Sequence, residues 1–167
     1  MSFFFLKQPF TMKLILIHTG KTKPDYLVAG CRDYYARIKK YLTFQEILLK
    51  DIRKSGNMTI EDIKRKEGEQ LLKIIQSSDI LVLFDRTGVS HSSESFAQFL
   101  EKLFISGKVL VFVTGGPYGF SDEVYKRSNY MISLSEMTYS HQMVRLLVAE
   151  QIYRALTIIN GGPYHHA

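Results

Sequence analysis

Cysteine is nearly absent from this sequence of 167 residues, with Cys31 as its single example. One cysteine excludes a disulfide framework and a cysteine-based metal site, and it fits a reducing compartment. Long hydrophobic runs are also missing, because no stretch approaches the roughly 20 apolar residues that a membrane span requires. The apolar residues 3–6 are too few for a signal-peptide core and follow no positively charged region. These absences predict a cytoplasmic protein without a membrane partner.

Common nucleotide-binding signatures are missing as well. The densest glycine cluster is Gly115-Gly116-Pro117-Tyr118-Gly119, and no Lys-Ser or Lys-Thr pair follows it, which excludes a P-loop. Its glycines lack the Rossmann spacing, and the cluster follows a late strand instead of the first one. Taken as a bare pattern, the cluster predicts a tight turn.

A single α/β domain is what the rest of the pattern predicts. The chain is 46% apolar, enough for one well-filled core and too short for two ordinary domains. Buried-strand patterns occur at residues 12–17, 44–49, 80–84, 109–113 and 130–134. Helical patterns occur at residues 24–42, 59–76, 92–105 and 141–160, with a short further helix after Ser121. This alternation predicts a mostly parallel sheet of five to six strands with flanking helices, formed by residues 12–167. Residues 1–11 are interpreted as an extension with no assigned role.

The positive charge is concentrated in the first half of the chain. Residues 13–73 hold 14 basic and 8 acidic side chains, a net +6, whereas residues 74–167 hold 7 and 8, a net −1. A positive field on one part of a domain is what a phosphate backbone selects, although an ordinary solvated surface is the alternative. Tyr34, Tyr35 and Tyr41 lie among these charges and are candidates for stacking on bases, or else core residues.

Two polar loops follow the last two buried strands of the predicted sheet. One begins at Thr114 and contains Gly115 and Gly116; the other runs over residues 135–141. Ligands bind at the carboxyl edge of open α/β sheets, and adjacent glycines let another molecule approach the backbone closely. The sequence therefore predicts one pocket built from both loops.

The last helical pattern, residues 141–160, is apolar around much more than one stripe. Such a helix must bury more than one face. A second subunit would cover it, and so would a central position within the monomer. The pattern leaves both possibilities open.

Four ordered motifs in the last third of the chain resemble one protein family. They are Gly115-Gly116-Pro117-x-Gly119, Leu134-Ser135-x-Met137-Thr138-x-x-His141-x-x-Val144-Arg145, Glu150-Gln151-x-Tyr153-Arg154-Ala155 and Gly162-x-Tyr164-His165. In this order they resemble the ribosomal large-subunit pseudouridine N3-methyltransferases, the RlmH family of the SPOUT class. Residues 12–17, residues 66–69 and the strand ending at Phe84 extend the likeness over nearly everything after Met12.

The resemblance implies a SPOUT fold with a C-terminal trefoil knot, an exception to the usual absence of knots. It implies S-adenosylmethionine as methyl donor, held by the loop after Phe84, the Gly115-Gly116 loop and residues 134–139. It also implies a homodimer paired through the last helix, with the site beside the interface. The implied substrate is N3 of a pseudouridine in 23S rRNA, on the assembled ribosome, and not DNA. The implied donor-binding residues are Phe84, Gly115, Gly116, Leu134, Ser135, Glu136, Met137, Thr138 and Tyr139.

Methyl transfer from a sulfonium needs no metal, because the leaving group is already good and alignment is the main task. The pseudouridine N3 must lose its proton, and the candidates to accept it are Glu136, His141, Tyr164 and His165. The residues do not decide between these four. A helix start at His141 would lower the pKa of its imidazole and favour the neutral form. One departure from the family pattern is Ser140, where proline is usual; a serine still caps a helix.

The predicted catalytic residues are His141, Arg145, Tyr164 and His165. Arg145 is a candidate to hold phosphate or to stabilise the dimer, and an interior arginine on this helix is more often paired with a carboxylate such as Glu150. Residues 161–163, Gly-Gly-Pro, end the helix, and we expect the following segment to fold over the donor and position the base.

Two other functions are compatible with the residues alone. The first is a non-catalytic RNA- or ribosome-binding module that uses the basic half of the chain. The second is an α/β enzyme with a nucleotide cofactor at Gly115-Gly116. Binding of S-adenosylmethionine without added metal distinguishes the methyltransferase from both.

Overall fold

The computed structural model describes residues 12–165, so the extension predicted for residues 1–11 lies outside the described part. One sheet contains five strands in the order β2-β1-β4-β3-β5, and every neighbouring pair is parallel. The strands are β1 Lys13–Thr19, β2 Thr43–Leu49, β3 Ile80–Ser90, β4 Leu110–Thr114 and β5 Tyr130–Ser133. The helices are α1 Asp25–Ile38, α2 Ile60–Ile74, α3 Ser93–Ile105, α4 Asp122–Arg127 and α5 His141–Ile159. The predicted α/β class and parallel sheet are confirmed.

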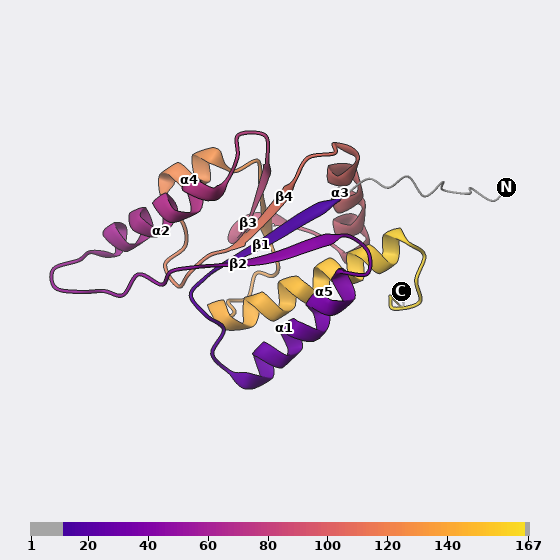
Figure 1. Cartoon of the computed structure of the whole chain (residues 1–167), viewed down its shortest axis with the longest axis horizontal. Coiled ribbons are helices and arrows are strands. Elements are labelled where there is room, and N and C mark those ends of the chain that lie inside the picture. Colours follow the sequence, from indigo (N-terminus) through magenta and orange to yellow (C-terminus); the bar gives the residue numbers. More distant parts are fainter. Residues whose placement is uncertain (1–11, 166–167) are drawn as a thin grey trace.

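Helices cover both faces of the sheet (Figure 1). Alternate residues of β4 show the division: Leu110 and Phe112 pack in one hydrophobic cluster with α1, α3 and α5. Val111 and Val113 pack in a second cluster with α2 and α4. A parallel strand buried on both faces is continuously apolar, which is why these runs were recognisable in the sequence. Among residues 12–165, no helix is long and apolar enough to cross a bilayer.

Helix α5 lies between α1 and α3 on one face of the sheet. Val148, Ala149 and Ile152 are completely buried within the monomer. The close approach of α1 depends on Gly30, because a Cβ atom there would lie 2.8 Å from Leu146 Cδ1. The broad apolar surface of α5 is therefore explained by its central position, one of the two possibilities that the sequence leaves open.

The segment after Phe84 crosses β5. Ile132 of β5 pairs with Phe84 and, after a shift in register, with Val89. A Cβ atom on Gly88 would lie 2.5 Å from the backbone of Met131 and Ile132. Only glycine therefore fits where this part of β3 approaches β5. Such a crossing is compatible with the trefoil knot that the family resemblance implies; the knot itself stays a prediction.

A buried polar network joins β1 to its neighbours. The His18 ring is completely buried; its Nδ1 lies 2.6 Å from Thr114 Oγ1 and its Nε2 lies 3.0 Å from the Tyr35 hydroxyl. Tyr35 in turn donates to Glu46 at 3.2 Å. Burial first, and then the positive charge of Arg145, lower the pKa of His18 from 6.5 to about 3. The imidazole is therefore neutral throughout the physiological pH range.

This lowered pKa predicts a loss of stability in acid. The unfolded chain takes up a proton at His18 below pH 6.5, whereas the folded chain does not until the pH nears about 3. The stabilising contribution of neutral His18 to the free energy of unfolding is therefore complete above pH 6.5 and is lost as the pH falls towards about 3. At pH 4.5 the loss should be about 3 kcal/mol, from roughly 1.4 kcal/mol for each pH unit. Urea unfolding at pH 7.5 and 4.5 measures it, and His18→Gln, which cannot titrate, should lose about 3 kcal/mol less than the unmodified protein. Equal pH dependence in both proteins would contradict the assignment.

Candidate functional site

A cavity of about 210 Å³ opens at the carboxyl edge of β3, β4 and β5. Residues 84–86 of β3, the loops that follow β4 and β5, and the first turn of α5 enclose it. The lining residues are Phe84, Asp85, Arg86, Gly115, Gly116, Pro117, Gly119, Phe120, Ile132, Ser133, Leu134, Ser135, Met137, Thr138, Tyr139, His141 and Val144. The carboxyl edge of a parallel sheet is where ligands bind in open α/β folds.

Most of the residues predicted to hold the donor line this cavity. They are Phe84, Gly115, Gly116, Leu134, Ser135, Met137, Thr138 and Tyr139. Glu136 is exposed and is not among the lining residues. Of the four predicted catalytic residues, His141 lines the cavity, whereas Arg145, Tyr164 and His165 lie outside it.

Sequence reasoning missed Asp85 and Arg86 as residues of the cavity wall. Two charged residues directly after the buried run that ends at Phe84 could have indicated them, because the sequence already predicts that the loop after Phe84 contacts the donor. Asp85 Oδ1 accepts hydrogen bonds from the Thr87 backbone at 2.8 Å and its hydroxyl at 2.6 Å, and Oδ2 accepts one from Tyr125 at 2.7 Å. Burial alone would raise the pKa of Asp85, but these hydrogen bonds lower it. An ionised carboxylate therefore stands at the cavity wall.

The glycine loop after β4 makes a tight turn, as its pattern predicts. Gly119 has φ 78°, and its N–H donates to the Gly116 carbonyl at 3.2 Å. A Cβ atom on Gly115 would lie 3.1 Å from Phe120 Cζ, and one on Gly116 would lie 3.2 Å from Glu67 Oε2. Neither glycine leaves room for a larger side chain without a shift of its neighbour, and the absence of a side chain exposes the loop backbone to a ligand.

The loop after β5 is held by its serines. The Ser133 hydroxyl donates to the Ser135 carbonyl at 3.0 Å, and the Ser135 hydroxyl accepts from the Met137 backbone at 3.0 Å. Ser140 accepts from the Met143 backbone at 3.2 Å and so caps α5, as expected for this departure from the family pattern. Met137 is 74% exposed at the cavity rim, where it is available to a ligand or a partner.

His141 is the first residue of α5 and lines the cavity. Burial lowers the pKa of its imidazole, the positive charges of Arg145 and Lys23 lower it further, and Asp51 opposes them. The lowered pKa agrees with the expected direction, but burial is the main cause. A neutral imidazole at the wall can accept a proton from a bound molecule.

Arg145 is buried beneath the segment that follows β1. It donates to the carbonyls of Thr19 and Gly20, the latter at 3.0 Å, and to the Thr22 hydroxyl at 3.0 Å. The expectation of a carboxylate partner is wrong for Arg145, because Glu150 pairs instead with Arg154, with Arg154 Nε 3.0 Å from Glu150 Oε1. Arg145 fixes a loop and does not face the cavity.

Tyr164 and His165 follow the end of α5 and fold back against its second half. The Tyr164 hydroxyl lies 3.1 Å from the Tyr34 hydroxyl and donates to Glu150 at 3.2 Å. His165 Nε2 lies 2.8 Å from Glu94 Oε1. Figure 1 shows α5 running from the carboxyl edge of the sheet, at left, to the other edge, at right. The segment is ordered against its own chain and remote from its own cavity.

No metal site accompanies the cavity in the described part of the chain, where no three potential ligands from His, Cys, Asp and Glu come together. The cavity offers backbone amides and carbonyls, apolar side chains, the Asp85 carboxylate, the Arg86 guanidinium and the His141 imidazole, together with the hydroxyl groups of its Ser, Thr and Tyr residues. This composition suits an organic ligand with polar edges.

Comparison with known proteins places the chain in a family. The model of the family described as "Predicted SPOUT methyltransferase" matches residues 12–165. The chain is 48% identical over 157 residues to ribosomal RNA large subunit methyltransferase H of Christiangramia forsetii, covering 93% of this chain and 99% of the relative. It is 44% identical over 156 residues to the protein of the same name from Bacteroides thetaiotaomicron, with the same coverage.

The fold has a solved counterpart in a probable methyltransferase from Bordetella pertussis Tohama I. The TM-score is 0.54 at 13% sequence identity, and the match covers 88% of this chain and 98% of that one. At this identity the likeness shows the fold alone. Together with the match of the family model over residues 12–165, it confirms the resemblance read from the four motifs: the chain belongs to the SPOUT methyltransferase family.

Proposed function

We propose that this protein uses S-adenosylmethionine to methylate N3 of a pseudouridine in large-subunit rRNA, in the cytoplasm. The observation that carries the proposal is the cavity built by three strand-end loops, with thin glycine backbone on one side and apolar walls on the other. Relatives that match 93% of this chain are named as large-subunit rRNA methyltransferases, which supports the substrate class.

The cavity residues fit the donor. Backbone groups of the Gly115-Gly116 turn and of residues 134–139 can bond the edge of the adenine, while Phe84 and Leu134 offer apolar walls. Asp85, held ionised, can accept hydrogen bonds from an ammonium or hydroxyl group of the donor. When bound, the donor supplies a methyl group activated by its sulfonium, and the chain's own task is alignment.

His141 is the residue of this chain best placed to take the proton from N3. It lies at the cavity wall, and burial keeps its imidazole neutral, so a ring nitrogen has a free lone pair. Glu136 is exposed and outside the cavity lining, and Tyr164 and His165 bond to Glu150 and Glu94, so all three are less well placed for this role than His141.

The proposed assembly is a homodimer in which the segment at residues 161–165 serves the cavity of the partner, because no residue of this segment lines the cavity of its own chain. In its own chain Tyr164 is held by Glu150 and Tyr153 of α5, with its hydroxyl 3.2 Å from Glu150 Oε1 and outside the cavity lining. A second copy, placed with α5 reversed, would bring its Tyr164 and His165 to this cavity.

Calorimetric titration and a transfer assay test the proposed function together. The protein should bind S-adenosylmethionine with no added metal and should move a labelled methyl group to unmodified large-subunit particles, at a pseudouridine located by mass spectrometry. Binding of a nicotinamide cofactor in place of the donor would establish the cofactor alternative. Tight binding to the particles without donor binding would establish the non-catalytic module.

A further inference from the structure

A second hollow, larger and more open than the cavity, lies at the carboxyl ends of β1 and β2. It has a volume of about 720 Å³, and we name it the basic groove. Its lining residues are Gly20, Lys21, Lys23, Leu48, Leu49, Lys50, Asp51, Ile52, Arg53, Ser55, Met58 and Lys66. We propose that the basic groove binds the phosphate backbone of the RNA strand that presents its target nucleotide to the cavity. This inference rests on the proposed function and names the surface that holds its substrate.

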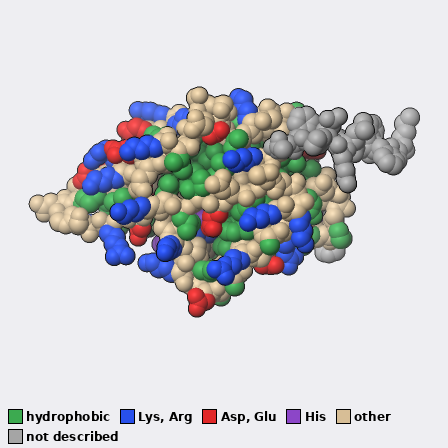
Figure 2. Space-filling view, in the orientation of Figure 1, with side chains coloured by type: hydrophobic (Ala, Val, Ile, Leu, Met, Phe, Trp, Pro, Cys, Tyr) green, Lys and Arg blue, Asp and Glu red, His purple; other side chains and the backbone are tan. Residues whose placement is uncertain are grey.

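The charge of the groove favours a polyanion. Five cationic side chains line it against a single carboxylate, Asp51. Among residues 12–165, none of these five cations forms an ion pair, whereas the neighbouring Lys64 and Arg65 are paired with carboxylates of α2. Unpaired cations gathered in a concave surface attract phosphate groups, while paired ones are already neutralised. Figure 2 shows Lys and Arg side chains at this end of the molecule, at left.

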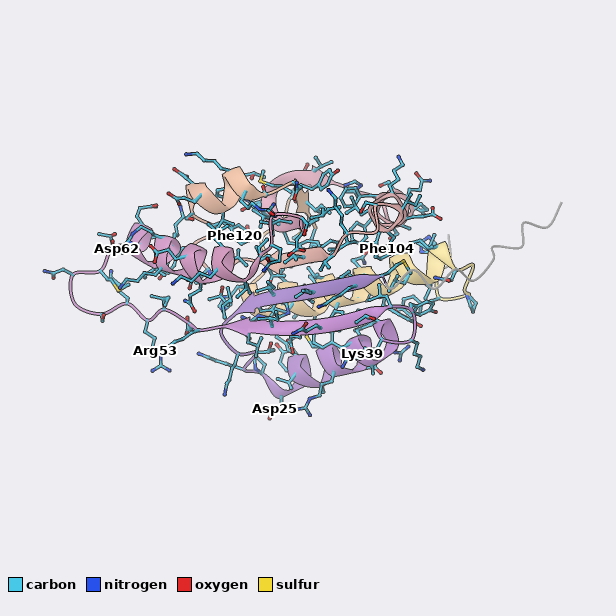
Figure 3. All side chains as sticks on the ribbon, turned by 45° about the horizontal axis from the view of Figure 1, so that its top comes forward. Asp25, Lys39, Arg53, Asp62, Phe104 and Phe120 are labelled. Atoms are coloured by element: carbon cyan, nitrogen blue, oxygen red, sulfur yellow. The ribbon has the colours of Figure 1, made fainter. Side chains whose placement is uncertain are left out.

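The groove also has surfaces for the apolar parts of a nucleotide. Leu48 is 44% exposed, and Ile52 and Met58 lie beside it in the lining. Arg53 projects outward from the segment between β2 and α2 (Figure 3). The wall is fixed at its base, because Gln70 accepts from the Lys50 backbone N–H at 3.2 Å and donates to the Lys50 carbonyl at 3.1 Å. A chain of alternating phosphates and sugars matches this combination better than a single small anion does.

The first turns of α5 join the groove to the cavity. Gln142 accepts from the Lys23 backbone N–H at 3.0 Å and donates to the Lys21 carbonyl at 3.4 Å. Its neighbour His141 lines the cavity, and the charges of Lys23 and Asp51 both act on the pKa of that histidine. Arg145, one turn further, holds the backbone at residues 19–20. The groove rim and the cavity wall are thus parts of one braced unit.

A second connection runs beneath the groove through Glu67. Its carboxylate lies against Gly116 in the loop after β4, and Gln70, one turn further along α2, holds the Lys50 backbone of the groove wall. Two separate links therefore hold the groove and the cavity in a fixed relation. A strand lying in the groove would pass directly beside the cavity, as a nucleotide-presenting strand must.

The test removes two groove cations and compares them with two distant ones. Lys50→Ala/Arg53→Ala should weaken equilibrium binding to large-subunit particles at least tenfold near 0.15 M salt. The slope of log affinity against log salt should fall by about 1.4, from roughly 0.7 for each phosphate contact on single-stranded RNA. Lys50→Arg/Arg53→Lys, which keeps both charges, should restore most of the affinity. The affinity for S-adenosylmethionine should stay within about twofold in all of these variants.

The matched control is Lys102→Ala/Lys108→Ala, which removes the same charge from exposed positions before β4, at the other edge of the sheet. It should change particle binding less than twofold. Equal weakening by the groove and control pairs would overturn the proposal, since net charge alone would then explain the effect. Failure of the unmodified protein to transfer a methyl group would instead count against the proposed function, while the binding comparison would still decide the role of the groove.

Discussion

Removal of residues 162–167 is expected to lower methyl transfer at least a hundredfold while changing the affinity for S-adenosylmethionine by less than about threefold. The size of the first effect follows from the usual contribution of a positioned proton acceptor or orienting group, about 10² to 10⁴ in rate. The second follows from geometry, because no described residue of this segment lines the cavity of its own chain. Single-turnover transfer and calorimetry on the truncated protein measure the two quantities.

Tyr164 is held against α1 and α5 of its own chain and does not line its own cavity. Its ring packs edge-on against Tyr153, with centroids 4.7 Å apart, and the Arg154 guanidinium lies 4.8 Å from the centroid of the Tyr164 ring. Burial and hydrogen bonds to Tyr34 and Glu150 raise the pKa of the Tyr164 hydroxyl. The phenol therefore stays protonated and acts as a hydrogen-bond donor, which leaves stacking and orientation of the base as its proposed contribution.

Mixed dimers provide the decisive form of this experiment. One subunit would lack residues 162–167 and keep its cavity; the other would carry Gly115→Val and keep its C-terminal segment. Neither homodimer should turn over, but the mixed dimer should regain one complete site. Mixed dimers can be isolated with a different affinity tag on each subunit. If they stay inactive, action in trans is contradicted, and normal turnover by the truncated homodimer would contradict it too.

The fold was predictable because β4 and the first half of β3 are buried on both faces. Runs such as residues 109–113 are continuously apolar, without alternating polar residues, and each ends in a polar loop. The continuation of β3 from Asp85 to Ser90 was missed. Its pairing with β5 resumes only at Val89, after a shift in register beside Gly88. That pairing joins residues more than 40 positions apart, and no local pattern encodes it.

The sequence predicts which loops form the cavity better than it predicts which individual side chains line it. Asp85 and Arg86 line the cavity because β3 lies between β4 and β5 and so passes both of their loops, which is a property of strand order. Arg145 was misjudged for another reason. Its partners are the backbone carbonyls of Thr19 and Gly20, and every residue has a carbonyl, so sequence patterns cannot identify them.

Substitution of Gly115 by valine is expected to lower the affinity for S-adenosylmethionine more than tenfold. A Cβ atom at this position would lie 3.1 Å from Cζ of Phe120, which itself lines the cavity. The ring can yield by a few tenths of an ångström for one carbon, but the branched γ carbons of valine require a larger displacement. Either the ring moves into the cavity or the loop backbone moves towards the ligand, and both reduce the space for the donor.

A graded pair of variants separates loss of binding from loss of folding. Overpacking of this kind costs about 1–3 kcal/mol, which a domain with about 5–15 kcal/mol of stability survives. Gly115→Ala should therefore bind the donor slightly less well and Gly115→Val much less well, while Ala29→Val, on the exposed side of α1, should bind it normally. Calorimetry measures the affinities and thermal unfolding checks the fold. Normal donor binding by a folded valine variant would show that the donor does not lie on this loop; if that variant does not fold, undiminished binding by Gly115→Ala would lead to the same conclusion.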